Sequence, residues 1–126
     1  MATLDQTVRD TTALVAVCAL VDLGVNRGVA ALIDGRAIAL FALPDGTLAA
    51  IDNLDPCSGA SVLSRGLVGE LDGRFTVASP MYKHRFDLRT GRCLDADGAG
   101  VAVHRVSVVD GSVLVALDPP LDGDPR

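Results

Sequence analysis

Aromatic and basic residues are scarce in this 126-residue chain. There is no tryptophan, and there are only one tyrosine and three phenylalanines. The chain therefore has almost no aromatic side chains on which the bases of a single-stranded nucleic acid could stack. One lysine and ten arginines stand against sixteen acidic residues, which gives a net charge of −5. A chain without an overall basic footprint is not expected to bind nucleic acid.

Cysteine and long apolar runs are also scarce. Cys18, Cys57 and Cys93 are an odd number at irregular spacing. This pattern fits neither a disulfide framework nor a paired CxxC metal site, so we expect reduced thiols. No apolar run approaches the ~18 residues of a membrane-spanning helix. The first twelve residues lack the charged-then-apolar pattern of a signal peptide. We therefore expect a cytoplasmic protein without a membrane partner.

No segment shows a sustained helical periodicity, whereas Asp-Gly pairs recur along the chain. Four such pairs, at 34–35, 45–46, 72–73 and 110–111, lie between short apolar or branched runs. Asp-Gly in that setting is typical of a type I′ hairpin turn, in which both residues take positive φ. The expected strands are residues 15–21, 29–33, 37–43, 47–51, 67–71, 74–79, 85–88, 92–94, 103–109 and 112–117. Many short strands with frequent turns predict an all-β protein, a sandwich or small barrel of antiparallel strands.

Two runs indicate how the strands are covered. Residues 37–43 are apolar at every position, which predicts a strand buried on both faces. Val113, Val115 and Leu117 alternate with other residues, which predicts one buried face for the last strand. Residues 1–12 are polar, and residues 118–126 hold three prolines and three acids. We expect both ends to be flexible tails around one domain, residues 13–117.

Two polar loops interrupt the apolar strands, and each contains proline. The first is residues 53–61 and the second lies within residues 78–91. The second reads Pro, then Phe-Asp-Leu, then Thr-Gly. Two such loops facing each other on a β scaffold resemble the cluster-binding loops of the Rieske iron-sulfur family. That family holds a [2Fe-2S] centre with two cysteines and two histidines.

Matching the second loop to that family places other residues at the ligand positions. Ser79 falls at the second cysteine and Tyr82 at the second histidine, while the first loop places Asp55 at the first cysteine and Cys57 at the first histidine. A serine hydroxyl, a neutral tyrosine and one carboxylate do not replace thiolate and imidazole donors. The resemblance therefore implies a Rieske-like fold that has lost its cluster, with these four residues at former cluster positions.

A narrower resemblance follows from four motifs taken together. Those motifs are Asp55-Pro-Cys-Ser-Gly-Ala60, Val62-Leu-Ser-Arg-Gly66, Ser79-Pro-Met-Tyr-Lys-His-Arg-Phe86 and Thr90-Gly-Arg-Cys93. They are similar to the small subunit of the NAD(P)H-dependent assimilatory nitrite reductase, the NirD family, over roughly residues 15–117. Cys57 stands where this family usually has an aromatic residue, and His84 where glutamine is common.

The resemblance implies an accessory role in the reduction of nitrite to ammonium during nitrate assimilation. FAD, an iron-sulfur cluster and sirohaem would belong to a large catalytic subunit, the expected partner. The sequence has no GxGxxG after a strand and no CxxC set that could hold such groups. We therefore expect a non-catalytic subunit with no catalytic, cofactor-binding or metal-binding residue. The alternative is a Rieske-type [2Fe-2S] ferredoxin-like electron carrier, or a relic of one that serves another oxidoreductase.

Several loop residues allow two interpretations. Cys57 and His84, with Cys93, could be ligands or redox groups; alternatively, Cys57 packs as a small hydrophobe and His84 is a surface imidazole. Asp52 and Asp55 could form a carboxylate pair; alternatively, Asp55 caps its own loop. We expect Ser79 and Tyr82 to hydrogen-bond across the two loops. His104 is expected to face solvent or make a single hydrogen bond.

Basic residues gather in the second loop of this acidic chain. The expected docking residues are Arg65, Lys83, His84, Arg85 and Arg89, with Arg92 close by. They could form a docking surface for an acidic partner, or they could be an ordinary solvated face. Phe86 is expected to be buried behind the second loop, where its replacement by alanine would cost about 3 to 5 kcal/mol.

Overall fold

The computed structural model describes residues 14–117, and it is built almost entirely of antiparallel strands. The predicted tails, 1–12 and 118–126, lie outside the described residues. Two short 3₁₀ turns, η1 (Leu20–Asp22) and η2 (Leu63–Arg65), interrupt the strands. The strands are β1 (Val15–Ala19), β2 (Val29–Ile33), β3 (Arg36–Ala42), β4 (Leu48–Asp52), β5 (Leu67–Leu71), β6 (Arg74–Ala78), β7 (Arg85–Asp87), β8 (Val103–Val109) and β9 (Ser112–Ala116). The all-β prediction is confirmed.

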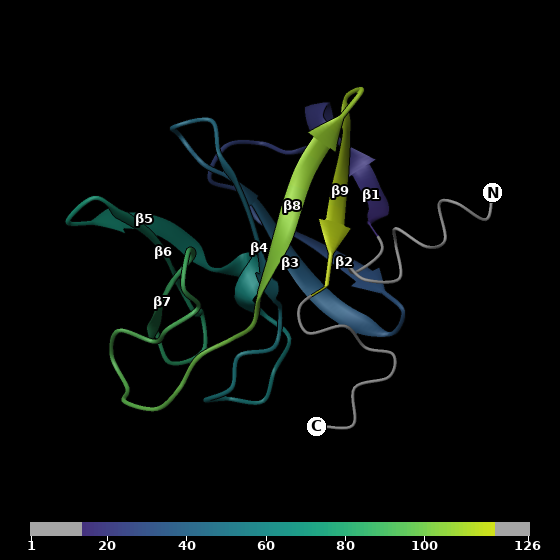
Figure 1. Cartoon of the computed structure of the whole chain (residues 1–126). Helices are drawn as coiled ribbons and strands as arrows, with labels where there is room; N and C mark the ends of the chain where they lie inside the picture. Colours follow the sequence, from purple (N-terminus) through teal and green to yellow (C-terminus); the bar gives the residue numbers. More distant parts are fainter. Residues whose placement is uncertain (1–13, 118–126) are drawn as a thin grey trace.

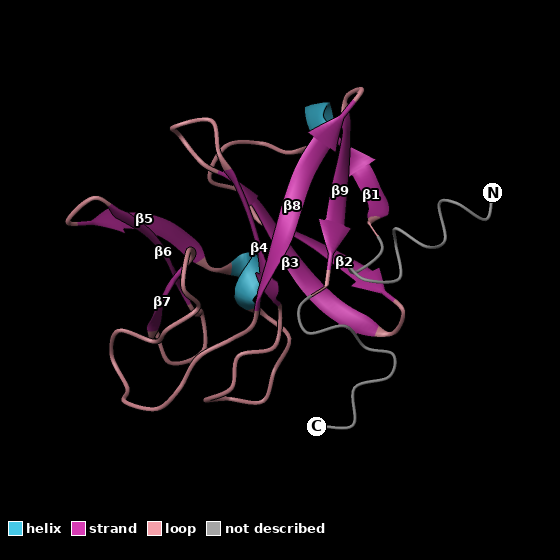
Figure 2. Cartoon of the chain, viewed as in Figure 1, coloured by secondary structure: helices cyan, strands magenta, loops and turns pink. Residues whose placement is uncertain are grey.

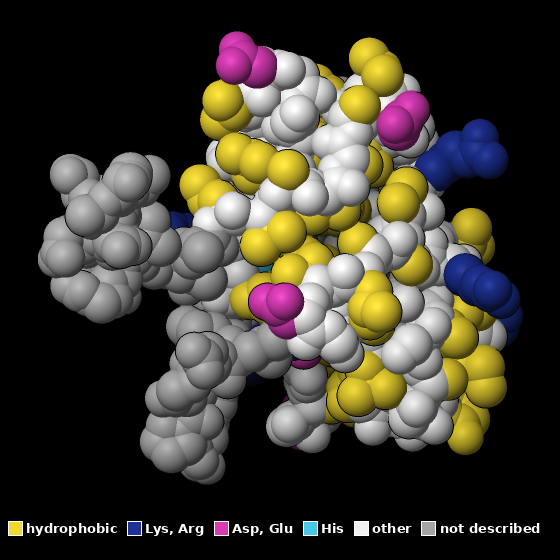
Figure 3. Space-filling view, turned by 90° about the vertical axis from the view of Figure 1, so that its right-hand side faces the viewer, with side chains coloured by type: hydrophobic (Ala, Val, Ile, Leu, Met, Phe, Trp, Pro, Cys, Tyr) yellow, Lys and Arg dark blue, Asp and Glu magenta, His cyan; other side chains and the backbone are white. Residues whose placement is uncertain are grey.

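The strands form two sheets that lie side by side (Figures 1 and 2). The larger sheet has six strands in the order β1-β9-β8-β4-β3-β2, and the smaller has the order β5-β6-β7. The larger sheet curls until its two edge strands, β1 and β2, line the same shallow hollow. The face over this seam carries many hydrophobic and few charged side chains (Figure 3). The larger sheet is therefore a nearly closed barrel, and the smaller sheet packs beside it.

Strand β3 lies between two hydrophobic cores. Ile38 and Leu40 point into a core inside the barrel, where Val113, Val115 and Leu117 also pack. Ala39 and Phe41 point to the other side, into a core shared with the smaller sheet. Every residue from 38 to 42 is buried. The predictions of a two-sided strand and of a buried face in the last strand are both confirmed.

The second core holds the smaller sheet and the turn η2 against β3 and β4. Leu63, Val77 and Phe86 are fully buried in it. Phe86 pairs with Val77 across β7 and β6, directly behind the second loop. The predicted burial of Phe86 is confirmed, so the polar loops lie on a rigid apolar support.

Of the four Asp-Gly pairs predicted to form hairpin turns, three form the expected turn. At 34–35, 72–73 and 110–111 both residues have positive φ, and each joins two paired strands. The prediction is wrong at 45–46, where only Gly46 has positive φ. A type I′ hairpin there would need a backbone N–H from Pro44, which proline lacks. The hairpin is closed instead by the pair Leu43 and Thr47, in which the Leu43 N–H donates to the Thr47 carbonyl (2.9 Å).

Two of the expected strands differ from the structure by more than one residue. The first strand ends at Ala19, because residues 20–22 turn into η1 instead of continuing to Val21. Residues 92–94 form no strand; only isolated bridges pair Phe86 with Cys93 and Arg92 with Gly100. Residues 92–94 are too few, and lack a long partner strand, to form a continuous ladder of strand hydrogen bonds. This segment is therefore a loop.

No helix in residues 14–117 is long and apolar enough to cross a membrane.

Candidate functional site

The first polar loop leaves β4 and is closed by its own hydrogen bonds. An isolated bridge pairs Leu54 with Ser61. The Asn53 amide nitrogen donates to the Ser61 carbonyl (3.2 Å), and the Asn53 amide oxygen accepts from the Ser64 N–H (2.7 Å). Asn53 is buried. This side chain therefore fixes the loop onto the turn η2 that follows it.

Asp55 joins the two loops. Its carboxylate is fully buried, and its Oδ2 accepts a hydrogen bond from the Ser79 hydroxyl (2.5 Å). Its Oδ1 accepts from the Cys57 N–H (2.8 Å), which caps the first loop as expected. The prediction that Ser79 bonds across the loops is confirmed. Two positions matched to cluster cysteines are thus bound directly to each other.

The second loop is a tight turn that begins at Ser79. The Ser79 N–H donates to the His84 carbonyl (2.9 Å), and the Lys83 N–H donates to the Ser79 carbonyl (2.8 Å). The Ser79 hydroxyl also accepts from the Met81 N–H (3.2 Å). Lys83 has a φ of 62°, a left-handed conformation that is uncommon for a residue with a side chain. The turn holds residues 80–83 outside the core.

Opposing effects act on the pKa of Asp55. Burial raises it, but the hydrogen bonds from the Ser79 hydroxyl and from the Cys57 backbone outweigh burial, so the pKa lies below its usual range. The ionised carboxylate is the form that accepts both bonds. Asp55 is therefore a charged structural anchor and not a general acid.

Cys57 is half-buried in the middle of the first loop. Burial raises the pKa of its thiol, and the charge on Asp55 and the nearby Cys93 raise it further. The thiolate is the reactive form of cysteine, and a raised pKa makes it rarer at neutral pH. The geometry favours the interpretation of Cys57 as a packed, protonated thiol.

Tyr82 and His84 stand at the outer part of the second loop. Tyr82 makes no side-chain hydrogen bond among the described residues, so the prediction that it bonds across the loops is wrong. Its side chain is 59% exposed, and its ring lies 6.2 Å from the His84 ring, tilted by 52°. His84 is not a plain surface imidazole, because its Nδ1 is buried and finds no hydrogen-bond partner within the described residues.

The donor set at the former cluster positions does not fit an iron-sulfur cluster. Asp55 and Ser79 are committed to their mutual hydrogen bond, and Cys57 supplies the only thiol among the four positions. Tyr82 points outward and is a hard oxygen donor. A Rieske centre needs two thiolates and two imidazoles. Across residues 14–117, no group of three or more His, Cys, Asp or Glu side chains is arranged to hold a metal ion.

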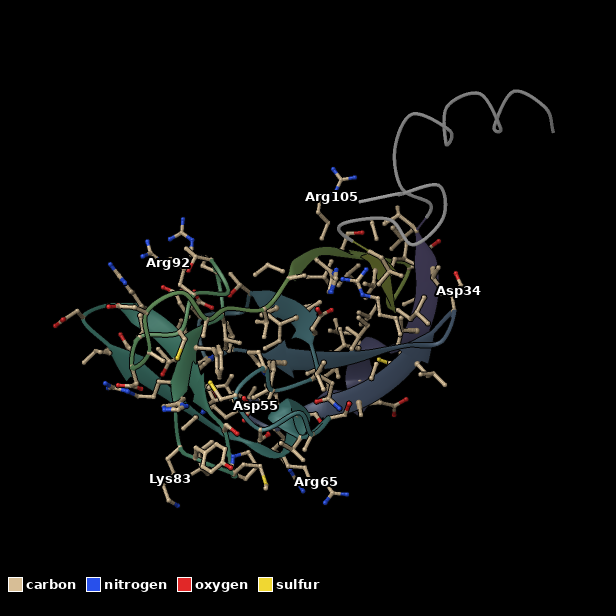
Figure 4. The ribbon with its side chains drawn as sticks, turned by 90° about the horizontal axis from the view of Figure 1, so that it is seen from below. Asp34, Asp55, Arg65, Lys83, Arg92 and Arg105 are labelled. Atoms are coloured by element: carbon tan, nitrogen blue, oxygen red, sulfur yellow. The ribbon has the colours of Figure 1, made fainter. Side chains whose placement is uncertain are left out.

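The expected docking residues do not share one surface. Arg65 and Lys83 point to the same side of the molecule, below Asp55, and they line one small hollow (Figure 4). Arg92 points to the opposite side (Figure 4). Arg89 lines a different hollow together with Arg92. The structure therefore divides these cations between two places.

Arg85 has a partner that the sequence did not indicate. Its Nε and Nη2 donate to the two oxygens of Asp95 (3.0 and 2.9 Å), and its backbone N–H donates to the same carboxylate (2.8 Å). The hydrogen bonds from Arg85 hold the pKa of Asp95 at about 2. Asp95 lies ten residues further on, in an irregular segment, so no periodic pattern pointed to it.

Asp52 and Asp55 do not form a carboxylate pair. Asp52 Oδ1 lies 2.8 Å from His104 Nε2 and accepts from Arg36 Nε (3.3 Å). Burial raises the pKa of Asp52, but the contacts with His104 and Arg36 outweigh it and leave the pKa lowered. Two alternatives were predicted for His104: His104 is buried, so the solvent-facing one is wrong, and it does make a hydrogen bond, to Asp52. It stands opposite Ala50 in β4, which makes Asp52 its diagonal neighbour on the same sheet face.

Comparison with known proteins identifies the family. Residues 13–116 match the family model described as a Rieske-like [2Fe-2S] domain. A nitrite reductase (NADH) small subunit from Salmonella typhimurium is 40% identical over 98 residues, which are 77% of this chain and 91% of that protein. A crystal structure of a putative NADH-dependent nitrite reductase small subunit from Mycobacterium tuberculosis has a TM-score of 0.81 at 42% identity, covering 84% of this chain and 96% of that one.

A longer relative matches as well. A nitrite reductase [NAD(P)H] large subunit from Klebsiella oxytoca is 43% identical over 100 residues, which are 79% of this chain but only 10% of that protein. This chain thus spans about a tenth of the length of that relative and most of the length of the small subunits. Together with the two facing loops and their shared Asp55–Ser79 contact, these matches place the chain in the Rieske-like domain family and, within it, in the family of nitrite reductase small subunits.

Proposed function

We propose that this chain is the accessory small subunit of an NAD(P)H-dependent nitrite reductase and that it works without a cluster of its own. The observation that carries the second part is the buried Ser79–Asp55 hydrogen bond. It joins the two loops where a Rieske protein would place its iron, and it uses both side chains to do so. Family membership supports the first part.

The partner in this proposal is the large catalytic subunit. The relative from Klebsiella oxytoca supports it, because a protein named large subunit there contains a stretch similar to this chain. FAD, an iron-sulfur cluster and sirohaem would then belong to the partner. The reduction of nitrite to ammonium would take place on that subunit, in the cytoplasm, and this chain would contribute binding surface.

The docking surface we propose is the loop-tip surface, defined as Leu54, Arg65, Met81, Tyr82 and Lys83. Its members Leu54, Met81 and Tyr82 are each about half exposed. Arg65 and Lys83 have no ion pair among the described residues. Exposed Tyr and Met beside unpaired cations are typical of interface hot spots.

The experiment is an affinity pull-down of the large subunit by the tagged full chain. Tyr82→Ala combined with Lys83→Glu should weaken retention about tenfold, because it removes an aromatic anchor and reverses a charge. Arg105→Glu is the control, since Arg105 is exposed and points to the opposite side of the molecule from Lys83 (Figure 4). Equal retention of both variants would show that the loop tips do not dock, and no retention of the unmodified chain would refute the accessory role.

Iron analysis separates the proposal from an electron-carrier function. Chain purified without oxygen should contain no stoichiometric iron or sulfide and no visible absorbance, because the donor set offers one thiol. Two irons and two sulfides per chain would establish a Rieske-type carrier instead.

A further inference from the structure

Two neighbouring hollows, beside the β3–β4 turn and the β5–β6 hairpin, share part of their lining. The first, about 380 Å³, is lined by residues of the turn joining β3 to β4, of the hairpin of β5 and β6, and of the segment after β7. Figure 1 shows the turn and the hairpin on the left of the molecule. The second, about 640 Å³, lies between that hairpin and the segment after β7. Arg74 and Arg89 line both. We call the two together the inter-sheet groove.

The first half of the groove is mainly apolar. Leu43, Leu48, Phe75 and Leu88 line it, contributed by both sheets. Asp45 also lines it, but the carboxylate of Asp45 is bound by the backbone N–H and the hydroxyl of Thr47 (3.0 and 2.6 Å). An apolar hollow of this size accepts one or two aliphatic or aromatic side chains.

The second half is cationic. Arg74, Arg89 and Arg92 line it, and neither Arg89 nor Arg92 has an ion pair among residues 14–117. Asp87 lies at its inner side, where it is almost fully buried. Its Oδ1 accepts from the Arg89 N–H (2.7 Å), and its Oδ2 lies 3.6 Å from Arg74.

The buried carboxylate therefore fixes the backbone that carries the arginines without neutralising Arg89 or Arg92. Asp97 is the other acid that lines this half, so three arginines meet one solvent-facing carboxylate there. Arg74 is paired with Asp87, so the guanidinium groups without an ion pair among the described residues are those of Arg89 and Arg92, in a chain whose net charge is −5. Guanidinium groups bind carboxylates in a planar, two-bond geometry.

We infer that the inter-sheet groove is a docking site for an acidic segment of a partner protein, one that places an apolar side chain in the first half and its carboxylates on Arg89 and Arg92. Charge complementarity selects this occupant, because an apolar peptide would leave the arginines unpaired and a basic one would be repelled. The groove shares no residue with the loop-tip surface. The inference stands on the groove alone and does not require the proposed function.

The test uses backbone amide NMR spectra of the full chain, titrated with a synthetic peptide of one leucine flanked on each side by two glutamates. Amides of Gly73, Phe75 and residues 88–92 should shift, and those at the loop tips should not. Arg89→Glu combined with Arg92→Glu should weaken binding about tenfold or more. Arg27→Glu combined with Arg105→Glu changes the net charge equally at two exposed positions outside the groove, and it should leave the affinity nearly unchanged.

Two further probes identify the occupant. A peptide with serine in place of leucine should bind about tenfold more weakly, because it leaves the apolar half empty. Inorganic phosphate should compete only poorly. If the serine peptide or phosphate binds as well as the leucine peptide, the site is a small oxyanion site and the inference is overturned. Equal weakening by the two double variants would also overturn it, because the peptide would then respond only to net charge.

Discussion

At the scale of single residues, the contact between Asp55 and Ser79 is the centre of the account. A buried carboxylate is costly unless its oxygens accept hydrogen bonds, and here Ser79 and the Cys57 backbone supply them. The packing of the two loops against each other therefore depends on two side chains, one from each loop. This contact holds the two loops together through protein side chains alone.

Replacing Ser79 tests that contact. Ser79→Ala should lower the free energy of unfolding by about 1.5–3 kcal/mol, since it removes a hydrogen bond to a buried charge. The measurement is urea denaturation, with the midpoint falling at unchanged slope. Ser107→Ala, at an exposed position on β8, is the control and should stay within about 0.5 kcal/mol. A Ser79 variant as stable as the control would show that the bond does not hold the loops.

The pH dependence of stability follows from the same pair. The folded-state pKa of Asp55 is lowered, so its contribution is complete above its unfolded pKa of about 4 and is lost as the pH falls through the folded value. Acid unfolding of Asp55→Asn should therefore show a weaker dependence on pH below about 4. An unchanged acid transition would mean that Asp55 is not ionised in the folded protein.

Asp95 gives a direct spectroscopic test. Titration of its carboxyl carbon by NMR should give a pKa of about 2 in the unmodified chain. In Arg85→Gln the value should return toward 3.8, because the guanidinium that stabilises the carboxylate is gone. If the two titrations coincide, the ion pair is absent in solution, and Arg85 is again available as a docking residue.

At the scale of elements, a glycine explains the Thr-Gly motif of the second loop. Gly91 has a φ of 79°, and a Cβ there would collide with the Val101 carbonyl. Gly98 has a φ of 81° but open space around it. Gly98→Ala should cost about 1–2 kcal/mol for the left-handed conformation alone, and Gly91→Ala should cost about 1–3 kcal/mol more. Equal losses of stability for the two variants in thermal denaturation would mean that the segment carrying the Val101 carbonyl moves aside without cost.

The elements also show what could be predicted from the sequence. Hairpins at 34–35, 72–73 and 110–111 were predictable because the turn residues act locally. Pro44 changed the fourth hairpin by removing a donor. The pairing of β8 with β4 and the resulting contact of His104 with Asp52 join residues 52 positions apart. No local pattern encodes such a contact, so the burial of His104 was missed.

At the scale of the whole molecule, the two-sided strand β3 organises both the barrel core and the core under the loops. The apolar run 37–43 made that predictable. The candidate site was predictable in part: Ser79 bonds across the loops as expected, whereas Tyr82 points outward. The division of the cations between the loop tips and the inter-sheet groove was not, because neighbours in a loop point to opposite sides.

The central claim is that a cluster-free small subunit binds a catalytic large subunit. Sedimentation velocity of the full chain, alone and mixed with the large subunit, tests it directly when followed in the ultraviolet and at a visible wavelength absorbed by the large subunit. The account predicts that the chain alone sediments without visible absorbance, and that in the mixture it moves with the visible boundary. A chain that carries visible absorbance by itself, or that sediments separately from the large subunit, would contradict the account.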